Sequence, residues 1–450
     1  MADTATYRTI WRWHFYAGLF VLPFVLILSV TGAIYLFKPQ IDRWEERDFR
    51  GHSLAGAVSA DRQLEAALAA YPQGHFKHYR MPEQRGDAAM VQLEMPGGAL
   101  AEVFVSPQGA VLGTLDPAGR ISAFVSKVHG SLLLGEWGDR LIELVASWTI
   151  VMILTGLYLW WPRPFIAAGT VYPRLALKGR PLLKDLHRVT GFWIAGLVLV
   201  MLASGLPWAG TWGGAFAWAR AELGLIQGPQ QWKVGAGDSA ADASALTHAS
   251  HHHTGRDMAE PEPDMSAASA GPALALSVFV AKAKTEAMAF PVLVVPPYAP
   301  QRFGPPTGNV WTIKSEAQNR PLIRSVTFNP VSGAEIGRSD FSDKHPIDRV
   351  INYGIAWHEG QLFGLANQIM GLIIAVAVIG LSALGVTLWL KRRPAGQLGA
   401  PASASAGLKP PIILLMVVLG IMLPLFGASM LALLLVNFIA LKLANLRVVN

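Results

Sequence analysis

Four apolar runs of membrane-spanning length divide the chain. They occupy roughly residues 14–37, 141–161, 188–208 and 363–390, and each is close to the ~20 apolar residues that a helix needs to cross a bilayer. The pattern therefore predicts four transmembrane helices. No small-residue cleavage site precedes Lys38-Pro39, so we expect the first run to be retained as an anchor and not removed as a signal peptide.

A fifth apolar stretch, residues 411–443, is longer than a single span needs and contains Pro424 and Gly427. Proline and glycine inside a helical pattern predict a break or a kink. Both a kinked helix and a hairpin of two short helices are compatible with this pattern. The basic residues Lys442 and Arg447 favour the hairpin, which returns the end of the chain to the cytoplasmic side.

The two long segments between these runs, about 38–140 and 209–362, each have the pattern of a small α+β unit. Each contains a helix-like stretch and then short strand-like stretches, and each ends in a strand–Pro–turn–strand–Gly sequence. The helices are expected at 61–70 and 274–288, and the strands at 90–93, 101–105, 106–113, 291–295, 310–314, 325–329 and 330–337. The shared ending predicts an internal duplication of the whole chain.

The second half is longer than the first. His14 and His187 are 173 residues apart (187 − 14), whereas His129 and His358 are 229 apart (358 − 129), which leaves 56 extra residues. Most of them fall in an Ala/Ser/Asp/Pro-rich tract, about 235–272, which we expect to be disordered. Its histidines, His248 and His251–His253, could chelate a metal transiently, but a flexible polar tract without catalytic consequence is the simpler interpretation.

Composition and charge support a membrane protein. Hydrophobic residues make up 52% of the 450 positions and charged residues only 15%. The net charge of +7 comes from basic residues beside the apolar runs, above all in the loop 162–187 and at Lys391-Arg392-Arg393. This distribution indicates membrane orientation and not nucleic-acid binding, with these loops in the cytoplasm. The expected order is a span with its N-terminus inside (1–37), an outer α+β domain (38–140), a span (141–161), a cytoplasmic loop (162–187), a span (188–208), a second outer α+β domain (209–362), a span (363–390), a cytoplasmic loop (391–410) and the apolar end (411–443).

Four histidines lie at the ends of these runs in a repeated context. His14 and His187 each have a glycine four residues on (Gly18, Gly191) and a Ser-containing glycine step that reaches its glycine eighteen residues on. His129 and His358 each have a glycine at +6 and a Gly-x-x-Leu-Trp sequence starting at +27. With 0 cysteines, iron–sulfur clusters, thiolate-bound haem, c-type haem and disulfides are excluded. Two pairs of histidines are what two non-covalent b-type haems need.

Sidedness predicts the pairs, because His14 and His187 belong to the cytoplasmic end and His129 and His358 to the outer end. Iron with two imidazole ligands is saturated, so such a haem transfers electrons and does not bind substrate. Gly18 and Gly191 would let the flat ring lie against the helix backbone, although close packing of membrane helices also favours small residues. The basic residues Arg12, Lys184 and Arg188 could hold haem propionates, although positive-inside anchoring explains them equally well. Four further histidines without repeated context are expected to be solvated: His52, His75, His78 and His345.

These features together resemble the PepSY-associated transmembrane family, iron-regulated proteins of the bacterial inner membrane that include ferric-siderophore reductases. The matching sequences include Trp11-Arg-Trp-His14, Val128-His129-Gly-Ser-Leu, Leu186-His187-Arg-Val-Thr-Gly191 and Trp357-His358-Glu-Gly. The resemblance implies PepSY-like domains in the periplasm and haem-dependent reduction of a ferric siderophore, with release of Fe(II). It leaves open which siderophore is the substrate. No nucleotide-binding motif is present, so the electrons are expected from a quinol or a cytoplasmic reductase.

Three other functions compete with this interpretation. The protein could be a quinone-linked haem electron carrier, or a membrane-anchored PepSY-type regulatory module without redox activity. Four membrane-edge histidines in duplicated context are unnecessary for the regulatory role. A transporter is also suggested by internal repeats, but the spans lack the midplane charges that coupled transport usually needs.

Overall fold

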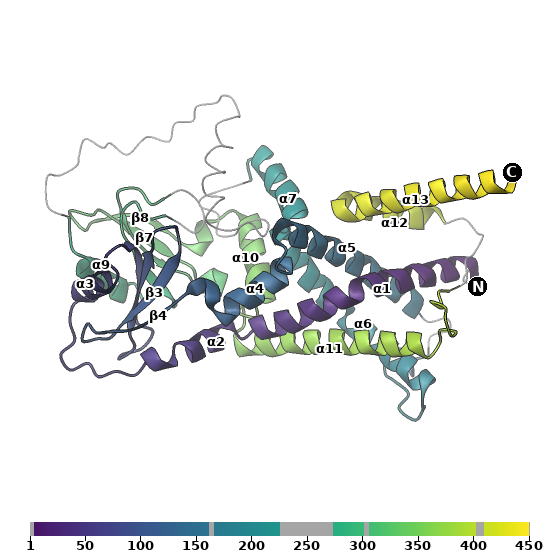
Figure 1. Cartoon of the computed structure of the whole chain (residues 1–450), viewed down its shortest axis with the longest axis horizontal. Helices are drawn as coiled ribbons and strands as arrows, with labels where there is room; N and C mark the ends of the chain where they lie inside the picture. The colour runs from purple at the N-terminus through teal and green to yellow at the C-terminus, as the bar shows by residue number, and fades with distance from the viewer. Residues whose placement is uncertain (1–3, 162–165, 226–272, 301–305, 402–408, 450) are drawn as a thin grey trace.

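A computed structural model describes residues 4–161, 166–225, 273–300, 306–401 and 409–449. Four of its helices are long and apolar enough to cross a membrane: α1 (Thr4–Tyr35), α5 (Gly135–Trp160), α6 (Arg180–Gly205) and α11 (Leu365–Leu390). Helix α1 packs against α5 and α11, and α6 packs against the same two, so the four helices close into a ring. They run alongside one another in Figure 1. Each of the four predicted spans corresponds to one of these helices. The helices α1, α5 and α6 begin six to ten residues before the apolar runs, because their polar first turns are also helical.

The strands form a single antiparallel sheet at one end of this bundle (Figure 1). The first half of the chain supplies β1 (His75–Arg80), β2 (Ala89–Glu94), β3 (Leu100–Val105) and β4 (Val111–Leu115), and the second supplies β5 (Val292–Val295), β6 (Trp311–Ser315), β7 (Ser325–Phe328) and β8 (Glu335–Ser339). Their order is β4-β3-β2-β1-β5-β6-β7-β8, so the two halves meet where Tyr79 pairs with Val294. The predicted strands are present, and β1 is an additional one that the sequence pattern did not reveal.

The two faces of the sheet differ because side chains alternate along each strand. Helices α3 (Ala60–Ala70) and α9 (Leu276–Thr285) cover one face and enclose an apolar core that includes Val91, Val103 and Phe279. The opposite face carries polar and charged side chains such as Glu102 and Lys314, which line a cavity between the sheet and the bundle. The sheet therefore presents a polar face toward the membrane helices.

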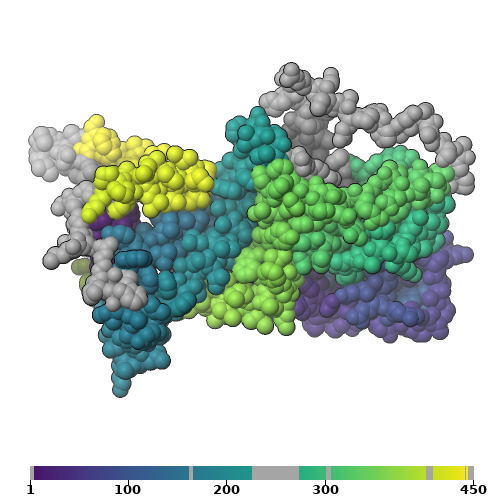
Figure 2. Space-filling model, turned by 180° about the vertical axis from the view of Figure 1, so that it is seen from behind, coloured from purple at the N-terminus to yellow at the C-terminus, as the bar shows by residue number. Residues whose placement is uncertain are grey.

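Short helices connect the sheet to the bundle. In the first half these are α2 (Lys38–Glu45), which follows α1 almost directly, and α4 (Ile121–Ser131), which precedes α5. In the second half α7 (Gly210–Glu222) follows α6, and α10 (Pro346–His358) precedes α11. The remaining connections include 3₁₀ turns at Arg47–Phe49, Pro117–Gly119, Leu206–Trp208, Arg320–Leu322 and Phe341–Asp343. Figure 2 shows the two halves lying side by side at the sheet end.

The apolar end of the chain is a helical hairpin. Helices α12 (Pro410–Met422) and α13 (Pro424–Val449) meet at Leu423 and pack against each other. Their contact is so close at Gly420 and Gly427 that a Cβ on Gly427 would lie 2.4 Å from the Gly420 carbonyl oxygen. Phe426 anchors the hairpin in a small apolar cluster with α5. Of the two alternatives that the sequence allowed, the hairpin is the one observed.

Candidate functional site

A single large cavity runs through the bundle to the polar face of the sheet. Its volume is about 3460 Å³, several times the ~300–1,000 Å³ of an ordinary small-molecule site. His14, His129, His187 and His358 all line it. At the end nearest the N-terminus, here called the basic end, it is lined by Arg180, Lys184, Arg188 and Arg392; at the other, the sheet end, it reaches the strands.

His129 and His358 face each other across the sheet end of the bundle. Their ring centroids are 6.2 Å apart and their planes are inclined by 76°. A metal–imidazole nitrogen bond is about 2.0–2.1 Å long, so two imidazoles on opposite sides of one metal ion have ring centres roughly 6 Å apart. Burial, and then the charge of His358, lowers the pKa of His129 to about 4, so its ring is neutral, as a metal ligand must be. The spacing of this pair fits two imidazoles that would hold one metal ion between them.

Each of these rings is fixed by a neighbouring membrane helix through its Nδ1 atom. His129 Nδ1 lies 3.0 Å from Thr31 Oγ1 of α1, whose own hydroxyl hydrogen is donated to the Ile27 carbonyl. His358 Nδ1 lies 3.0 Å from the Met201 carbonyl oxygen and 3.1 Å from Ser204 Oγ of α6. Because these oxygens accept, Nδ1 carries the proton and Nε2 keeps its lone pair for a ligand bond.

The inner pair, His14 and His187, lies at the basic end of the cavity. His14 Nδ1 lies 3.0 Å from the Met152 carbonyl oxygen and 3.1 Å from Thr155 Oγ1 of α5. His187 faces α11, where Gly385 is the nearest glycine. His14 and His187 are close enough for their charged forms to interact. The two predicted pairs are therefore each brought together in one cavity.

The glycines of the repeated sequence steps are the places where these rings rest. A Cβ on Gly32, Gly156 or Gly205 would lie 3.1–3.3 Å from Cε1 of His129, His14 or His358 respectively. Eighteen residues make about five turns and ~27 Å of α-helix, so His14 and Gly32 lie on the same face of α1 at opposite ends. His187 and Gly205 are related in the same way on α6. The spacing of eighteen thus presents one histidine and one receiving glycine to the same cavity.

The two glycines predicted to lie against a flat ring both line the cavity. A Cβ on Gly191 would meet nothing within 4 Å, and one on Gly18 would meet only Met152 Sδ, at 3.7 Å. Open space beside the backbone of α6 at this level is what a planar group packed against the helix requires. At Gly371 of α11, by contrast, a Cβ would lie only 2.8 Å from the Leu36 side chain.

The basic residues that were predicted to hold haem propionates differ in whether they line the cavity. Arg188 lines the cavity and donates to the Trp160 carbonyl oxygen (3.3 Å), while its buried Nε has no partner among the described residues. Arg12 does not line the cavity; its guanidinium lies over the Tyr16 ring, 5.5 Å from the centroid. Arg392 lies over the rings of Trp11 and Phe15 and lines the cavity instead. From the sequence alone, Arg392 is predicted only as part of the cytoplasmic cluster Lys391-Arg392-Arg393.

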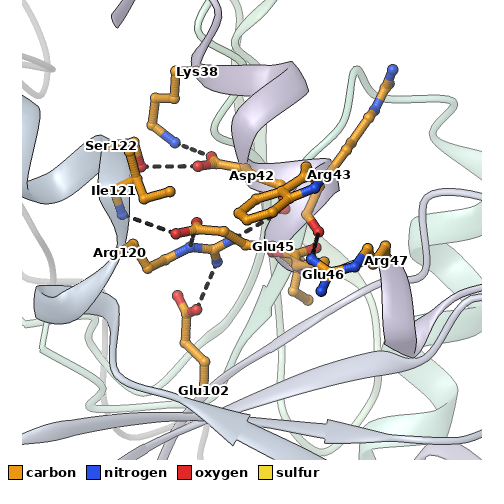
Figure 3. A network of polar contacts seen from close by, with 12 residues as sticks. Lys38, Asp42, Arg43, Glu45, Glu46, Arg47, Glu102, Arg120, Ile121 and Ser122 are labelled. Atoms are coloured by element: carbon orange, nitrogen blue, oxygen red, sulfur yellow. Dashed lines mark hydrogen bonds and ion pairs between the residues drawn. The ribbon is translucent and has the colours of Figure 1, made fainter. Parts of the chain in front are cut away.

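A network of buried charges joins the sheet end of the cavity to α4 (Figure 3). Arg120, directly before α4, donates to Glu45, Glu46 and Glu102 at 2.8–3.1 Å. Arg80 of β1 makes two further hydrogen bonds to Glu46. Burial alone would raise the pKa of Glu46, but Arg80 and Arg120 outweigh it and hold that pKa below its usual range. Burial prevails at Glu102 and raises its pKa, although Arg120 opposes the shift.

The other histidines are less exposed than the sequence analysis expected. Only His75 is exposed; His52 and His78 are half-buried, and His345 caps α10 by accepting from the backbone N–H of Ile347. The expectation failed for His78 because it lies on β1, where burial lowers its pKa to about 4. The tract with His248 and His251–His253 lies outside the described residues. Within the described ranges, no three His, Cys, Asp or Glu side chains converge to form a metal site.

The comparison with protein families agrees with this arrangement of helices. A family model described as the PepSY-associated TM region matches residues 11–392, which include all four histidines, most of α1, the other three long helices and the sheet. No curated protein matches the chain. Since the family model covers most of the sequence, the chain belongs to the family of proteins with a PepSY-associated transmembrane region.

Proposed function

We propose that this protein is a membrane oxidoreductase with about two b-type haems that passes electrons across the bilayer to a ferric siderophore and releases Fe(II). The observation that carries the proposal is the pair His129 and His358, whose ring centroids lie 6.2 Å apart in the cavity. Each ring is held by a hydrogen bond at Nδ1, which leaves Nε2 available as a ligand atom. Two aromatic rings that merely packed against each other would not need a hydrogen bond to hold each ring in place.

The residues of the cavity fit the group that the proposal requires. Two facing neutral imidazoles are the ligand set of a six-coordinate haem, and the chain has no cysteine to offer instead. Gly191 leaves room beside α6 for a flat ring, and the buried Nε of Arg188 is a donor without a partner among the described residues, as a haem propionate would require. A haem bound at each pair would supply one-electron chemistry.

The protein's own contribution is to fix the two pairs at opposite ends of one apolar bundle. His14 and the glycine that receives His129 are separated by ~27 Å along α1, so the two sites lie near opposite faces of a ~30 Å hydrocarbon layer. With the basic end in the cytoplasm, the sheet lies on the outer side of a bacterial inner membrane. The matched roles of α1 and α6, and of α4 and α10, support an internal duplication with one PepSY-like unit in each half.

The chelate would be held at the sheet end and not at an iron ligand position. An iron with two histidine ligands has no free position, so the acceptor must approach the edge of the site. The polar face of the sheet supplies charged and polar side chains to the same cavity there, among them Arg80, Glu102 and Lys314. These groups of both signs line the same cavity as His129 and His358, and they support a polar acceptor at this end.

The experiment begins with the absorption spectrum of the purified protein. We expect about two low-spin, six-coordinate haems per chain. Chemically reduced protein should then be reoxidised on adding a ferric siderophore, with the Fe(II) trapped by a ferrous chelator. The His129→Ala protein should lose this reoxidation. His75→Ala is the matched control, because His75 is an exposed outer histidine away from the pair, and it should behave as the unaltered protein.

Two outcomes would contradict the proposal. A haem-free protein from haem-replete cells, or a five-coordinate high-spin spectrum, would remove the ligand assignment. Reduced protein that ignores every class of ferric siderophore but is oxidised rapidly by a quinone would replace the reductase with a quinone-linked electron carrier.

A further inference from the structure

The four histidines are not held equally. In three of them Nδ1 meets a hydroxyl from the residue just before the receiving glycine: Thr155 for His14, Thr31 for His129 and Ser204 for His358. The corresponding position before Gly385, which faces His187, is Leu384. The fourth site therefore lacks the hydroxyl that its three counterparts share.

Two features of the structure accompany this difference. His187 Nδ1 is buried and has no hydrogen-bond partner among the described residues. The Leu381 carbonyl, which corresponds to that of Met152, interacts with the ring but does not reach hydrogen-bonding geometry. The ring also stands farther from its helix, since a Cβ on Gly385 would lie 3.9 Å from His187 Cε1, against 3.1 Å for Gly156 and His14.

A hydrogen bond from Nδ1 changes what a histidine does as a ligand. An acceptor at Nδ1–H orients the ring and increases the electron density at Nε2, which makes the imidazole a stronger donor. A stronger donor stabilises Fe(III) relative to Fe(II) and lowers the reduction potential of the iron. His187, without a full acceptor, is accordingly the weakest donor of the four.

We propose that Leu384 is a positioning residue that sets the reduction potential of the inner haem, by withholding from His187 the hydroxyl acceptor that the other three ligands have. The inference rests on the proposed function, since it concerns a haem held by His14 and His187. With leucine at position 384, a haem held by His14 and His187 would have a higher reduction potential than with threonine or serine there. That property suits the site at which electrons enter the protein.

The test compares Leu384→Thr with Leu384→Val. The two side chains have nearly the same shape and differ in the hydroxyl, so any change in packing is common to both. Redox titration of the purified two-haem protein should show a lower inner-haem potential in Leu384→Thr than in Leu384→Val. We expect about a tenfold change in the ratio of reduced to oxidised inner haem, which is about 59 mV for one electron. The outer-haem potential should not move.

The reciprocal change is at Thr155, which serves His14 at the same haem. Thr155→Val should raise the reduction potential of the inner haem by a similar amount. Thr155→Ser, which keeps the hydroxyl, should leave that potential as it is in the unaltered protein. Loss of one signal in His129→Ala assigns the two potentials to the inner and outer sites.

Three results would overturn the inference. Two-haem protein with equal inner potentials in Leu384→Thr and Leu384→Val would do so, as would a Thr155→Val protein with an unchanged inner potential. Either would leave the proposed function intact. Protein without haem would instead remove the proposed function, and this inference with it.

Discussion

The two halves of the molecule anchor their outer histidine helices at matching places with opposite charges. In the first half the cation is on the histidine helix: Arg120, at the start of α4, contacts Glu45 and Glu46 on and after α2, the extension of α1. In the second half the cation is on the extension: Arg220 of α7, which follows α6, pairs with Asp348 at the start of α10 at 2.7 Å, both side chains being buried. Each outer histidine helix is thus tied at its N-terminal end by ions and at its histidine by a hydroxyl and a glycine.

The difference shows which feature both halves share. Neither the charge nor the residue type is common to the two anchors, but both lie near the start of the histidine helix, nine residues before His129 (129 − 120) and ten before His358 (358 − 348). Each half holds its own histidines, because His129 rests on α1 and His358 on α6. The facing pairs, in contrast, join one half to the other. Docking within a half and pairing between halves can therefore be tested separately.

The largest effect should come from removing a member of a facing pair. His129→Ala or His358→Ala should abolish the outer haem and leave the inner one, and His14→Ala or His187→Ala should do the converse, so that haem content falls from about two to about one per chain. Haem content and the reduced-minus-oxidised spectrum measure this. If His14→Ala and His129→Ala, which lie in the same half, removed the same signal, pairing between halves would be wrong.

The next largest effect should come from breaking the anchor of α10. Arg220→Met leaves the buried carboxylate of Asp348 without this cation, which should cost about 3–5 kcal/mol of stability. The double variant Arg220→Met with Asp348→Leu removes both charges and should recover most of the loss. Thermal unfolding of the protein in detergent measures both. If the double variant were as unstable as Arg220→Met alone, the pair would stabilise the protein by more than the mutual neutralisation of its two buried charges.

The stability that the first-half anchor contributes should depend on pH. Arg120→Met leaves Glu45, Glu46 and Glu102 with fewer cations, and we expect a loss of about 3 kcal/mol near neutral pH, less than complete because Arg80 still contacts Glu46. In the unaltered protein the lowered pKa of Glu46 contributes stability that is present above the ordinary glutamate pKa and is lost as pH falls through the lowered value.

Without Arg120 that contribution is already reduced, and protonation relieves the remaining carboxylates. The stability difference between the unaltered protein and Arg120→Met should therefore shrink as the pH falls below the ordinary glutamate value. The raised pKa of Glu102 acts in the opposite direction in the unaltered protein, so the difference between the two proteins is the quantity to measure. A difference that grows on acidification would contradict this account of the anchor.

Much of the fold followed from periodicity, and the exceptions have physical reasons. Apolar runs and alternating strands predicted the four spans and seven of the eight strands. The strand β1 was missed because its sequence, His-Phe-Lys-His-Tyr-Arg, carries charge on the face toward the cavity and has too few apolar positions to show alternation. The joining of both halves into one sheet depends on the pairing of β1 with β5, more than two hundred residues away, which local patterns do not encode.

The site was predictable to a similar degree. Repeated spacing identified the four histidines and the glycine steps, but it did not show that each step receives the ring of another helix. Arg120 was missed because its partners Glu45 and Glu46 are remote in sequence and belong to a different helix. Repetition in a sequence shows which residues matter together, whereas their contacts depend on the packing of the helices.

The smallest effects should come from adding one methyl group at the receiving glycines. A Cβ on Gly156 or Gly32 would lie 3.1 or 3.2 Å from the histidine ring, so alanine there must displace the ring by a few tenths of an ångström. Overpacking of this kind costs about 1–3 kcal/mol, and it should alter the haem spectrum.

Gly385→Ala is the matched control, because its Cβ would lie 3.9 Å from His187, in ordinary contact. Alanine there should leave the spectrum unchanged and stabilise α11 slightly, since glycine is the weaker helix former. A spectrum altered more by Gly385→Ala than by Gly156→Ala would mean that His187 is held as closely as His14, and that the four ligand sites are alike after all.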